Sequence, residues 1–313
     1  MKKMLTSCLV AVPLIVMADT IPSLGTNGGA MVLPEGKLTL NYRQLYFKRD
    51  SMYDGSSKVT NSENLNAKAN ISIFAFGYGL DDKTTLSLII PYKNFRADAK
   101  LGQDVKVRNS GLSDIWLNAR RIVYNSNGFL VAVDGGVKFP TGSKGKTFKQ
   151  KPMLLNDIKT TPPPTQLGTG EFEYKIGVGA TKILDESLRI DSNMHYIYRP
   201  KAKHDYDFGN EFAFNIGAVK ALEKRFNVGL DYAYTYNSKT DMGNYIDSTR
   251  GSKLPFKAFS GSSGYITPSV QFLPFGKPKL HVSAGVSFLA HYHLKERQPI
   301  EKQRYMVNIG YLF

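Results

Sequence analysis

Charged and amide side chains recur at every second position along several segments of this chain. These residues are Asp114, Asn118, Arg120, Glu171, Glu173, Lys175, Arg189, Asp191, Asn193, His195, Glu211, Asn215, Asn227 and Asp231. A spacing of two places side chains on one face of a β-strand. Because a buried ion is costly unless it is paired or hydrated, this face requires either a water-filled interior or a dense set of ion pairs. We therefore predict that the residues line a pore, and their mixed signs argue against a strongly ion-selective filter.

Other groups that could carry chemistry do not assemble into a recognisable site. The segment Gly142–Thr147 is close to a phosphate-binding loop, but Pro140 stands where that motif needs its first glycine. His291 and His293 share one strand face, yet two imidazoles without a third ligand more often line a wet surface than bind a metal. Cys8 is the only cysteine, so thiolate metal sites and nucleophilic cysteine chemistry are excluded elsewhere. We expect no metal, no cofactor and no catalytic residue.

Both ends of the chain predict export to a membrane. Met1–Ala18 has a basic start, a short apolar core and an acceptable cleavage site, which is the pattern of a secretory signal removed after Ala18. In Tyr305–Phe313 every second residue is aromatic or large and apolar, which predicts a strand with one apolar face. This segment resembles the terminal strand of bacterial outer-membrane β-barrels, in which a final aromatic residue is part of the assembly signal. The resemblance implies that the barrel-assembly machinery binds the strand that ends at Phe313.

Between these ends about twelve strand-like segments must position the polar face. They are Lys37–Arg49, Asn66–Leu80, Lys83–Phe95, Gly111–Tyr124, Gly128–Phe139, Gly168–Lys182, Ser187–Tyr198, Tyr206–Lys220, Arg225–Tyr236, Tyr265–Leu273, Lys279–His291 and Gln303–Phe313. Apolar and polar residues alternate along them, as in a barrel with lipid outside and water inside. A soluble sandwich gives the same alternation, but here short turns alternate with mostly long connections. That asymmetry predicts an all-β fold, a transmembrane antiparallel up-and-down β-barrel of the bacterial outer-membrane type.

The predicted barrel covers Lys37–Phe313. It is preceded by Asp19–Gly36, a segment punctuated by glycine and proline that we expect to be periplasmic or to plug the lumen. The longest connection, Pro140–Leu167, is long enough to fold inward and narrow the pore. Further predicted loops are Asp50–Leu65, Arg96–Ser110, Arg199–Asp205, Asn237–Gly264 and Tyr292–Lys302.

The formal net charge of +15 bears on the partners that the chain attracts. In the cytosol such a balance favours nucleic acid, but an exported chain meets lipopolysaccharide phosphates and anionic solutes instead, so we expect no nucleic-acid partner. The basic residues Lys144, Lys146, Lys149 and Lys151 gather in the longest connection. They either contact lipopolysaccharide and other anions or belong to an ordinary solvated loop. Outer-membrane lipid and a small-molecule solute are the remaining predicted partners.

Three short motifs resemble those of a known family. Gly111–Leu117 (GLSDIWL), Gly135–Gly142 (GGVKFPTG) and Leu167–Glu171 (LGTGE) are similar, in order and spacing, to successive motifs of the outer-membrane family "MetA-pathway of phenol degradation". The similarity extends from about residue 37 to the end of the chain. It implies an exported barrel that passes small organic molecules, aromatic or apolar ones among them. It implies no role for Trp116, and in physical terms the glycines end strands or let them bend.

The predicted function is passive transport in the bacterial outer membrane, as a channel for small organic solutes with a polar lumen and long basic extracellular loops. We expect the protein not to be an enzyme, but two other classes stay open. A barrel hydrolase would use a rim of acidic and histidine residues, for which His204, Asp205, Asp207, Asp241 and Asp247 are the candidates. A structural or adhesive surface barrel would carry longer apolar or repetitive loops than this sequence has.

Overall fold

The computed structural model describes residues 22, 24, 28–151, 160–200, 207–240 and 260–313. In this part of the chain the regular structure is a single sheet of fifteen strands and one short 3-10 helix at Pro163–Thr165. The strands are β1 (Leu38–Arg49), β2 (Ser51–Gly55), β3 (Ser57–Val59), β4 (Asn66–Asp81), β5 (Thr84–Leu101), β6 (Gln103–Leu112), β7 (Ile115–Ser126), β8 (Phe129–Phe139), β9 (Glu173–Ile183), β10 (Leu188–Tyr198), β11 (Glu211–Glu223), β12 (Phe226–Asn237), β13 (Gly261–Phe272), β14 (Leu280–Ile300) and β15 (Gln303–Leu312). No helix within the described ranges has the length and apolar character needed to cross a membrane.

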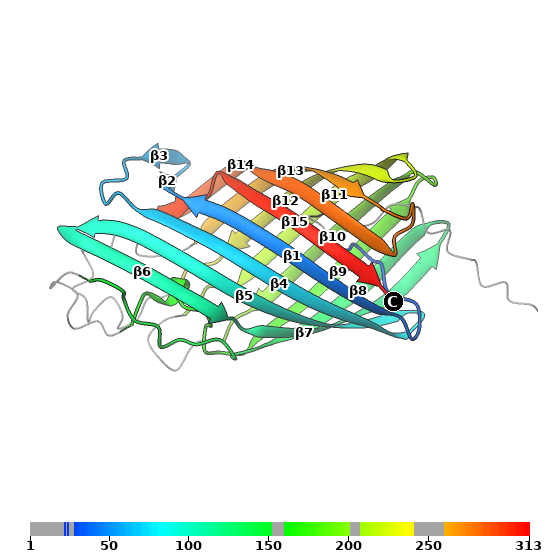
Figure 1. Ribbon diagram of the computed structural model, residues 1–313, viewed down its shortest axis with the longest axis horizontal. Coiled ribbons are helices and arrows are strands. Elements are labelled where there is room, and N and C mark those ends of the chain that lie inside the picture. Colours follow the sequence, from blue (N-terminus) through cyan, green and yellow to red (C-terminus); the bar gives the residue numbers. More distant parts are fainter. Residues whose placement is uncertain (1–21, 23, 25–27, 152–159, 201–206, 241–259) are drawn as a thin grey trace, which may run out of the picture.

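Twelve of the strands close into an antiparallel barrel (Figure 1). β1 closes the ring, because it pairs with β4 on one side and with β15 on the other. Around the rest of the wall β5 joins β4 to β7, and β7 to β15 pair with their neighbours in chain order. Each of the twelve strands overlaps one predicted segment. The prediction of a transmembrane barrel of the outer-membrane type is therefore confirmed.

The two ends of the barrel differ in their connections. β1 begins and β15 ends at the end with short turns, where the amide of Phe313 donates to the carbonyl of Leu38 at 2.9 Å. The turn between β7 and β8 has Asn127 at φ 49° and Gly128 at φ 70°, and two such angles give a turn that matches the twist of a hairpin. β2, β3 and β6 lie toward the opposite end (Figure 1). Following the topology of outer-membrane barrels, we call the end with short turns periplasmic and the opposite end outer.

Three segments that were predicted to be loops contain strands, so these predictions are wrong. Asp50–Leu65 holds β2 and β3, Arg96–Ser110 completes β5 and forms most of β6, and Tyr292–Lys302 is mostly an extension of β14. In the β5–β6 hairpin Ala97 and Val107 are buried, whereas charged residues take the more exposed positions. The alternation is present in the sequence, but its outward row is charged because this part of the sheet stands beyond the lipid-facing band.

Apolar residues cover the outside of the barrel, as the alternation predicts. Large exposed side chains include Phe74, Phe76, Leu88, Tyr174, Ile176, Leu230, Val270 and Ile309. At the alternate, inward positions of the strands the polar residues are buried, among them Asn118, Asn193 and Asp231. A soluble sandwich would bury the apolar row, so this exposure is the pattern of a wall that faces lipid outside and polar groups inside.

Candidate functional site

The three glycine-rich motifs meet at the outer end of β7, around the carboxylate of Asp114. Its Oδ1 accepts a hydrogen bond from the amide of Gly142 at 2.9 Å. Its Oδ2 accepts one from the amide of Thr169, also at 2.9 Å. Each motif thus contributes to a single contact, which we call the motif junction and define as Asp114, Gly142, Gly168 and Thr169. Only tertiary structure brings these residues together, since they are spread over more than fifty positions of the chain.

The motif junction depends on two glycines. A Cβ at Gly168 would lie 2.3 Å from the carbonyl oxygen of Gly142 and 2.5 Å from Oδ1 of Asp114. A Cβ at Gly142 would in turn lie 2.8 Å from Cα of Gly168. These glycines therefore let both ends of the longest connection approach the same carboxylate. The hydroxyl of Ser113 adds a hydrogen bond to the carbonyl of Leu167 at 2.5 Å, which ties the connection to the start of β7.

A chain of ion pairs runs from the motif junction around the inner wall. Nζ of Lys138 lies 3.0 Å from Oδ2 of Asp114 and also contacts Glu173. Nε of Arg199 lies 3.1 Å from Oε2 of Glu173, and its Nη2 lies 3.0 Å from Oε2 of Glu211. We call these five residues the outer ion network. Each buried charge is tolerated because it has an oppositely charged partner. Removing one partner from a buried ion pair is strongly destabilising.

Two cavities in the described part of the barrel lie one behind the other along its axis. The outer cavity has a volume of about 650 Å³ and is bordered by the outer ion network. The inner cavity has a volume of about 520 Å³ and lies nearer the periplasmic end. Their linings meet at Pro91 and Ile89 on β5, at Trp116 and Asn118 on β7, at Glu173 and Lys175 on β9, and at Ile197 and His195 on β10. At this level Nζ of Lys175 lies 5.8 Å from the centroid of the Trp116 ring, within the range of a cation–π contact.

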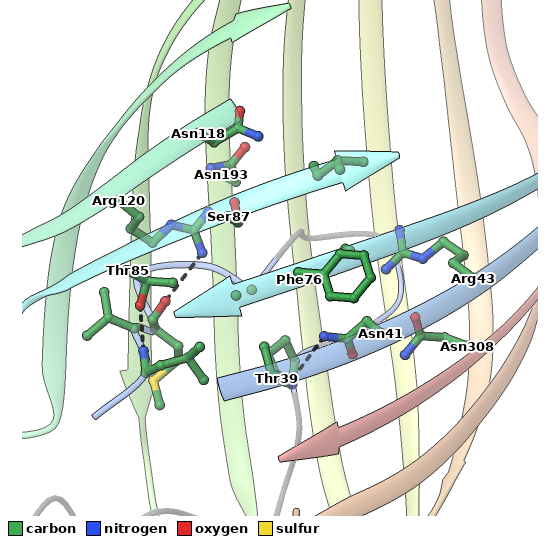
Figure 2. A pocket seen from close by; sticks show the side chains of 18 of the residues that line it. Thr39, Asn41, Arg43, Phe76, Thr85, Ser87, Asn118, Arg120, Asn193 and Asn308 are labelled. Atoms are coloured by element: carbon green, nitrogen blue, oxygen red, sulfur yellow. Dashed lines mark hydrogen bonds between the residues drawn. The ribbon is translucent and has the colours of Figure 1, made fainter. Parts of the chain in front are cut away.

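Residues that precede β1 lie inside the periplasmic half of the barrel. The amide of Ala30 donates to Oγ1 of Thr181 on β9 at 3.0 Å. The amide of Leu33 donates to Oγ1 of Thr85 on β5 at 2.7 Å, a bond that can be followed in Figure 2. Ala30 is completely buried. The stretch 28–33 is therefore attached to two separate parts of the wall and occupies space that would otherwise belong to the lumen.

The inner cavity is amphipathic. Its apolar lining includes Leu24, Met31, Val32, Leu33, Ile73 and Ile89. Its polar lining includes Asn41, Arg43, Asn118, Arg120, Asn193 and Asn308, whose arrangement is shown in Figure 2. Arg120 is held by Asp134, whose Oδ1 lies 2.7 Å from its Nε. Apolar surface with a few placed hydrogen-bonding groups is the usual character of a site for small organic molecules.

The structure separates the predicted pore-lining residues into groups. Asp114, Glu173 and Glu211 border the outer cavity, and Asn118, Arg120, Lys175, Arg189, Asn193 and His195 border the inner one. Asp191, Asn215, Asn227 and Asp231 are buried and border neither of these two cavities, and Glu171 precedes β9 and borders neither. Among these four buried residues, Asp191 forms an ion pair, because Nη2 of Arg189 lies 2.6 Å from its Oδ1.

Several residues of the site were not predicted. Trp116 borders the outer cavity, and its position between Asp114 and Asn118 in the alternation would have been enough to find it. Lys138 could have been found in the same way on β8. Arg199 carries no such signal, because it lies outside the strands. The apolar residues of 28–33 were expected near the lumen only as part of the segment Asp19–Gly36.

The basic residues of the longest connection are dispersed. The side chain of Lys144 lies near Gly170, whose added Cβ would be 2.7 Å from its Cδ. The amide of Lys149 donates to the carbonyl of Lys106 on β6 at 2.9 Å. Contact between lipopolysaccharide or other anions and the predicted residues Lys144, Lys146, Lys149 and Lys151 stays a prediction.

The alternative sites gain no support from the described residues. No group of three or more His, Cys, Asp and Glu residues in these ranges is placed to hold a metal ion. Nδ1 of His293 lies 3.1 Å from Oγ of Ser56. Among the proposed hydrolase residues only Asp207 is described, whereas His204, Asp205, Asp241 and Asp247 lie outside the described residues. The predicted signal, Met1–Ala18, lies outside them as well.

The closed wall and its polar interior define the class of protein: a transmembrane β-barrel of the bacterial outer-membrane type. Residues 25–290 match the model of the family described as "Putative MetA-pathway of phenol degradation", and the chain belongs to this family. The resemblance inferred from the three motifs is thereby confirmed. No curated protein matches the sequence.

Solved structures of other barrels are similar to this one. An outer membrane channel from Pseudomonas putida F1 matches with a TM-score of 0.67 at 14% identity, over 91% of this chain and 98% of that chain. The P. putida toluene transporter TodX matches with a TM-score of 0.46 at 9% identity, over 90% of this chain and 91% of that chain. A NanC porin matches with a TM-score of 0.47 at 9% identity, over 87% and 98% of the two chains. The first of these likenesses supports the fold.

Proposed function

We propose that this protein is a passive outer-membrane channel for small organic solutes, with aromatic or apolar compounds among them. The observation that carries the proposal is the pair of cavities in line along the barrel, the inner one with an amphipathic lining. Each volume is in the range that holds one small organic molecule. The family description, which names phenol degradation, supports this class of solute.

In the proposed mechanism a solute diffuses from the outer cavity to the inner one. Paired ions of both signs border the outer cavity, so its lumen attracts neither cations nor anions strongly. The aromatic face of Trp116 offers a first contact for an aromatic ring. The solute then passes the Lys175–Trp116 contact and meets the apolar residues of 28–33. A concentration gradient supplies the driving force.

Two segments control the width of this route in the proposed mechanism. The stretch 28–33 acts as the plug at the periplasmic end, as part of the segment Asp19–Gly36 that follows the cleaved signal. The connection Pro140–Leu167 restricts the outer mouth through the motif junction. We further propose that the assembly machinery binds the strand that ends at Phe313.

Replacing Trp116 by Ala tests the route. The mature chain is refolded into planar bilayers for single-channel recording and into vesicles for swelling assays with phenol as the solute. We expect Trp116→Ala to raise the conductance by about twofold or more, because it removes a ring at the level where the cavities meet. Leu117→Ala is the matched control, because Leu117 is the next residue and its side chain is exposed on the outside of the barrel.

The possible results separate the parts of the proposal. Wild-type protein that gives neither conductance nor phenol uptake would contradict a channel. Equal conductance in wild type and Trp116→Ala would contradict only the role of this residue.

A further inference from the structure

Four basic residues face one another across four neighbouring strands on the outside of the barrel. Lys48 on β1 is directly opposite Lys68 on β4, and Lys68 is directly opposite Arg96 on β5. Arg96 is in turn directly opposite Arg108 on β6. All four residues are exposed. We call them the basic row.

The basic row is unfavourable in the absence of a ligand. Like charges that are directly opposite on adjacent strands destabilise a sheet. At the two ends of the row Lys48 and Arg108 each pair with an aspartate, at 2.8 Å and 2.5 Å. At its centre, the side chains of Lys68 and Arg96 have no ion pair or hydrogen bond within the described part of the chain. Two adjacent positive charges thus remain without a counter-ion from the described residues of the protein.

The strands that carry the basic row also make apolar contacts on their inner face. On their opposite face Ala67, Ala97 and Val107 are buried and pack with Phe95 and Phe148. These contacts fix β4, β5 and β6 relative to one another, and β1 is joined to β4 by strand pairing. At a strand spacing of about 4.8 Å, a row across four strands is about 14 Å long. The positive groups therefore form a linear surface of fixed length rather than a set of mobile loop charges.

The outward positions below the basic row show where it stands relative to lipid. From the apolar band toward the outer end, successive outward positions on β4 and β5 are Phe74 and Ile90, then Ser72 and Tyr92, then Asn70 and Asn94, and then Lys68 and Arg96. Toward the outer end the outward side chains thus change from apolar to hydroxyl-bearing, then to amide and finally to basic. Phe74 and Lys68 are six positions apart, which is about 20 Å along a strand and about 14 Å along the membrane normal at a tilt of 45°. Lys68 and Arg96, at the centre of the basic row, therefore lie beyond the outer edge of the apolar band, on the side of the outer-leaflet headgroups.

We infer that the basic row binds the phosphorylated sugar headgroup of lipopolysaccharide. Phosphate groups supply the missing negative charge to Lys68 and Arg96, and a guanidinium can hold a phosphate through two parallel hydrogen bonds. Sugar hydroxyls match the amide of Asn94, one outward position nearer the apolar band. A phospholipid headgroup offers fewer hydroxyl groups to this amide than a phosphorylated sugar does. The inference is independent of the channel proposal, because the basic row lies on the outside of the wall.

The test compares two double substitutions that remove the same charge. Lys68→Gln/Arg96→Gln removes the centre of the basic row, and Lys224→Gln/Arg225→Gln removes an exposed Lys–Arg pair at the periplasmic end. The mature chain and both variants are refolded in detergent without lipopolysaccharide and titrated with purified lipopolysaccharide, and the bound lipid is measured by native mass spectrometry. We expect the first variant to bind about tenfold more weakly or worse, and the second to bind as the wild type does.

A stability measurement separates a lost site from a damaged fold. Because the first variant relieves repulsion between opposite strands, its urea midpoint without lipopolysaccharide should equal or exceed that of the wild type. If it fails to fold, the single variant Arg96→Gln is used in the same titration with the same expected direction. Equal affinity of the wild type and the folded variant would overturn the inference.

Three other ligands identify the group that is recognised. Dephosphorylated lipopolysaccharide, phosphatidylglycerol vesicles and inorganic phosphate should each bind more weakly than intact lipopolysaccharide. Phosphatidylglycerol or inorganic phosphate that bound as tightly would overturn the assignment to a phosphorylated sugar, because it would indicate general attraction of anions.

Discussion

Replacing Asp114 by Asn tests the motif junction, because Asn keeps the size of the side chain but not its two acceptor oxygens. In the structure Oδ1 faces the amide of Gly142 and Oδ2 faces the amide of Thr169. An Asn side chain has one oxygen and one NH2 group, so one of the two backbone N–H groups would face another donor. Nζ of Lys138, which lies 3.0 Å from Oδ2, would also lose a charged partner.

We expect Asp114→Asn to lower the free energy of unfolding by about 2–4 kcal/mol. A hydrogen bond to a charged group contributes about 1.5–3 kcal/mol, and at least one such bond is lost. Lys138 keeps Glu173 as a partner, so the loss stays near the lower part of the range of about 3–5 kcal/mol for breaking a buried pair. The control is Asp98→Asn, which breaks a much more exposed pair with Arg108 and should cost about 0–1 kcal/mol.

The assay is urea unfolding of the refolded chains, followed by tryptophan fluorescence. Trp116 is the only tryptophan in the chain and lies two residues from Asp114, so its emission reports on this part of the wall. Equal unfolding free energies for Asp114→Asn and Asp98→Asn would refute the conclusion that the carboxylate holds the junction. If the reasoning is correct, Asp114→Asn should also increase current fluctuations in planar bilayers, because the longest connection would be less firmly attached.

Further predictions concern backbone space and pH. Gly168→Ala should lower the unfolding free energy by about 1–3 kcal/mol, because its Cβ would lie 2.3 Å from the carbonyl oxygen of Gly142. Gly135→Ala, whose Cβ would meet nothing within 4 Å, should change it by less than about 0.5 kcal/mol in the same urea experiment. Arg297 donates to both carboxylate oxygens of Glu63, at 2.9 Å and 2.6 Å, and this hydrogen bonding holds the pKa of Glu63 below its ordinary value of 4.5. The stabilisation of residues 60–65 is therefore fully present above about pH 4.5 and is lost as the pH falls through the lowered pKa. Hydrogen exchange of these residues between pH 6 and pH 3 measures the loss, and protection in Glu63→Gln that followed the same pH course would contradict it.

The sequence by itself determined the barrel. A two-residue period of apolar and polar side chains is a local property, and it located all twelve wall strands. The motifs were also sufficient to identify the family. The same alternation continues in Arg96–Ser110 but does not resemble that of a wall strand, because beyond the apolar band the outward row is charged instead of apolar.

Only the tertiary structure decided which polar residues act together. The pair Lys138–Glu173 depends on the register between β8 and β9, and the pair Arg199–Glu211 depends on how the end of β10 lies beside β11. Neither pair can be read from the pattern of a single strand. The attachment of Ala30 to Thr181 depends on a wall that has already closed. The basic row depends on four strands whose pairing places Lys48, Lys68 and two arginines directly opposite one another. Periodicity sets which way each side chain points, whereas its partners are set by long-range pairing, and this is why the lumen and the outer surface could be described only from the folded barrel.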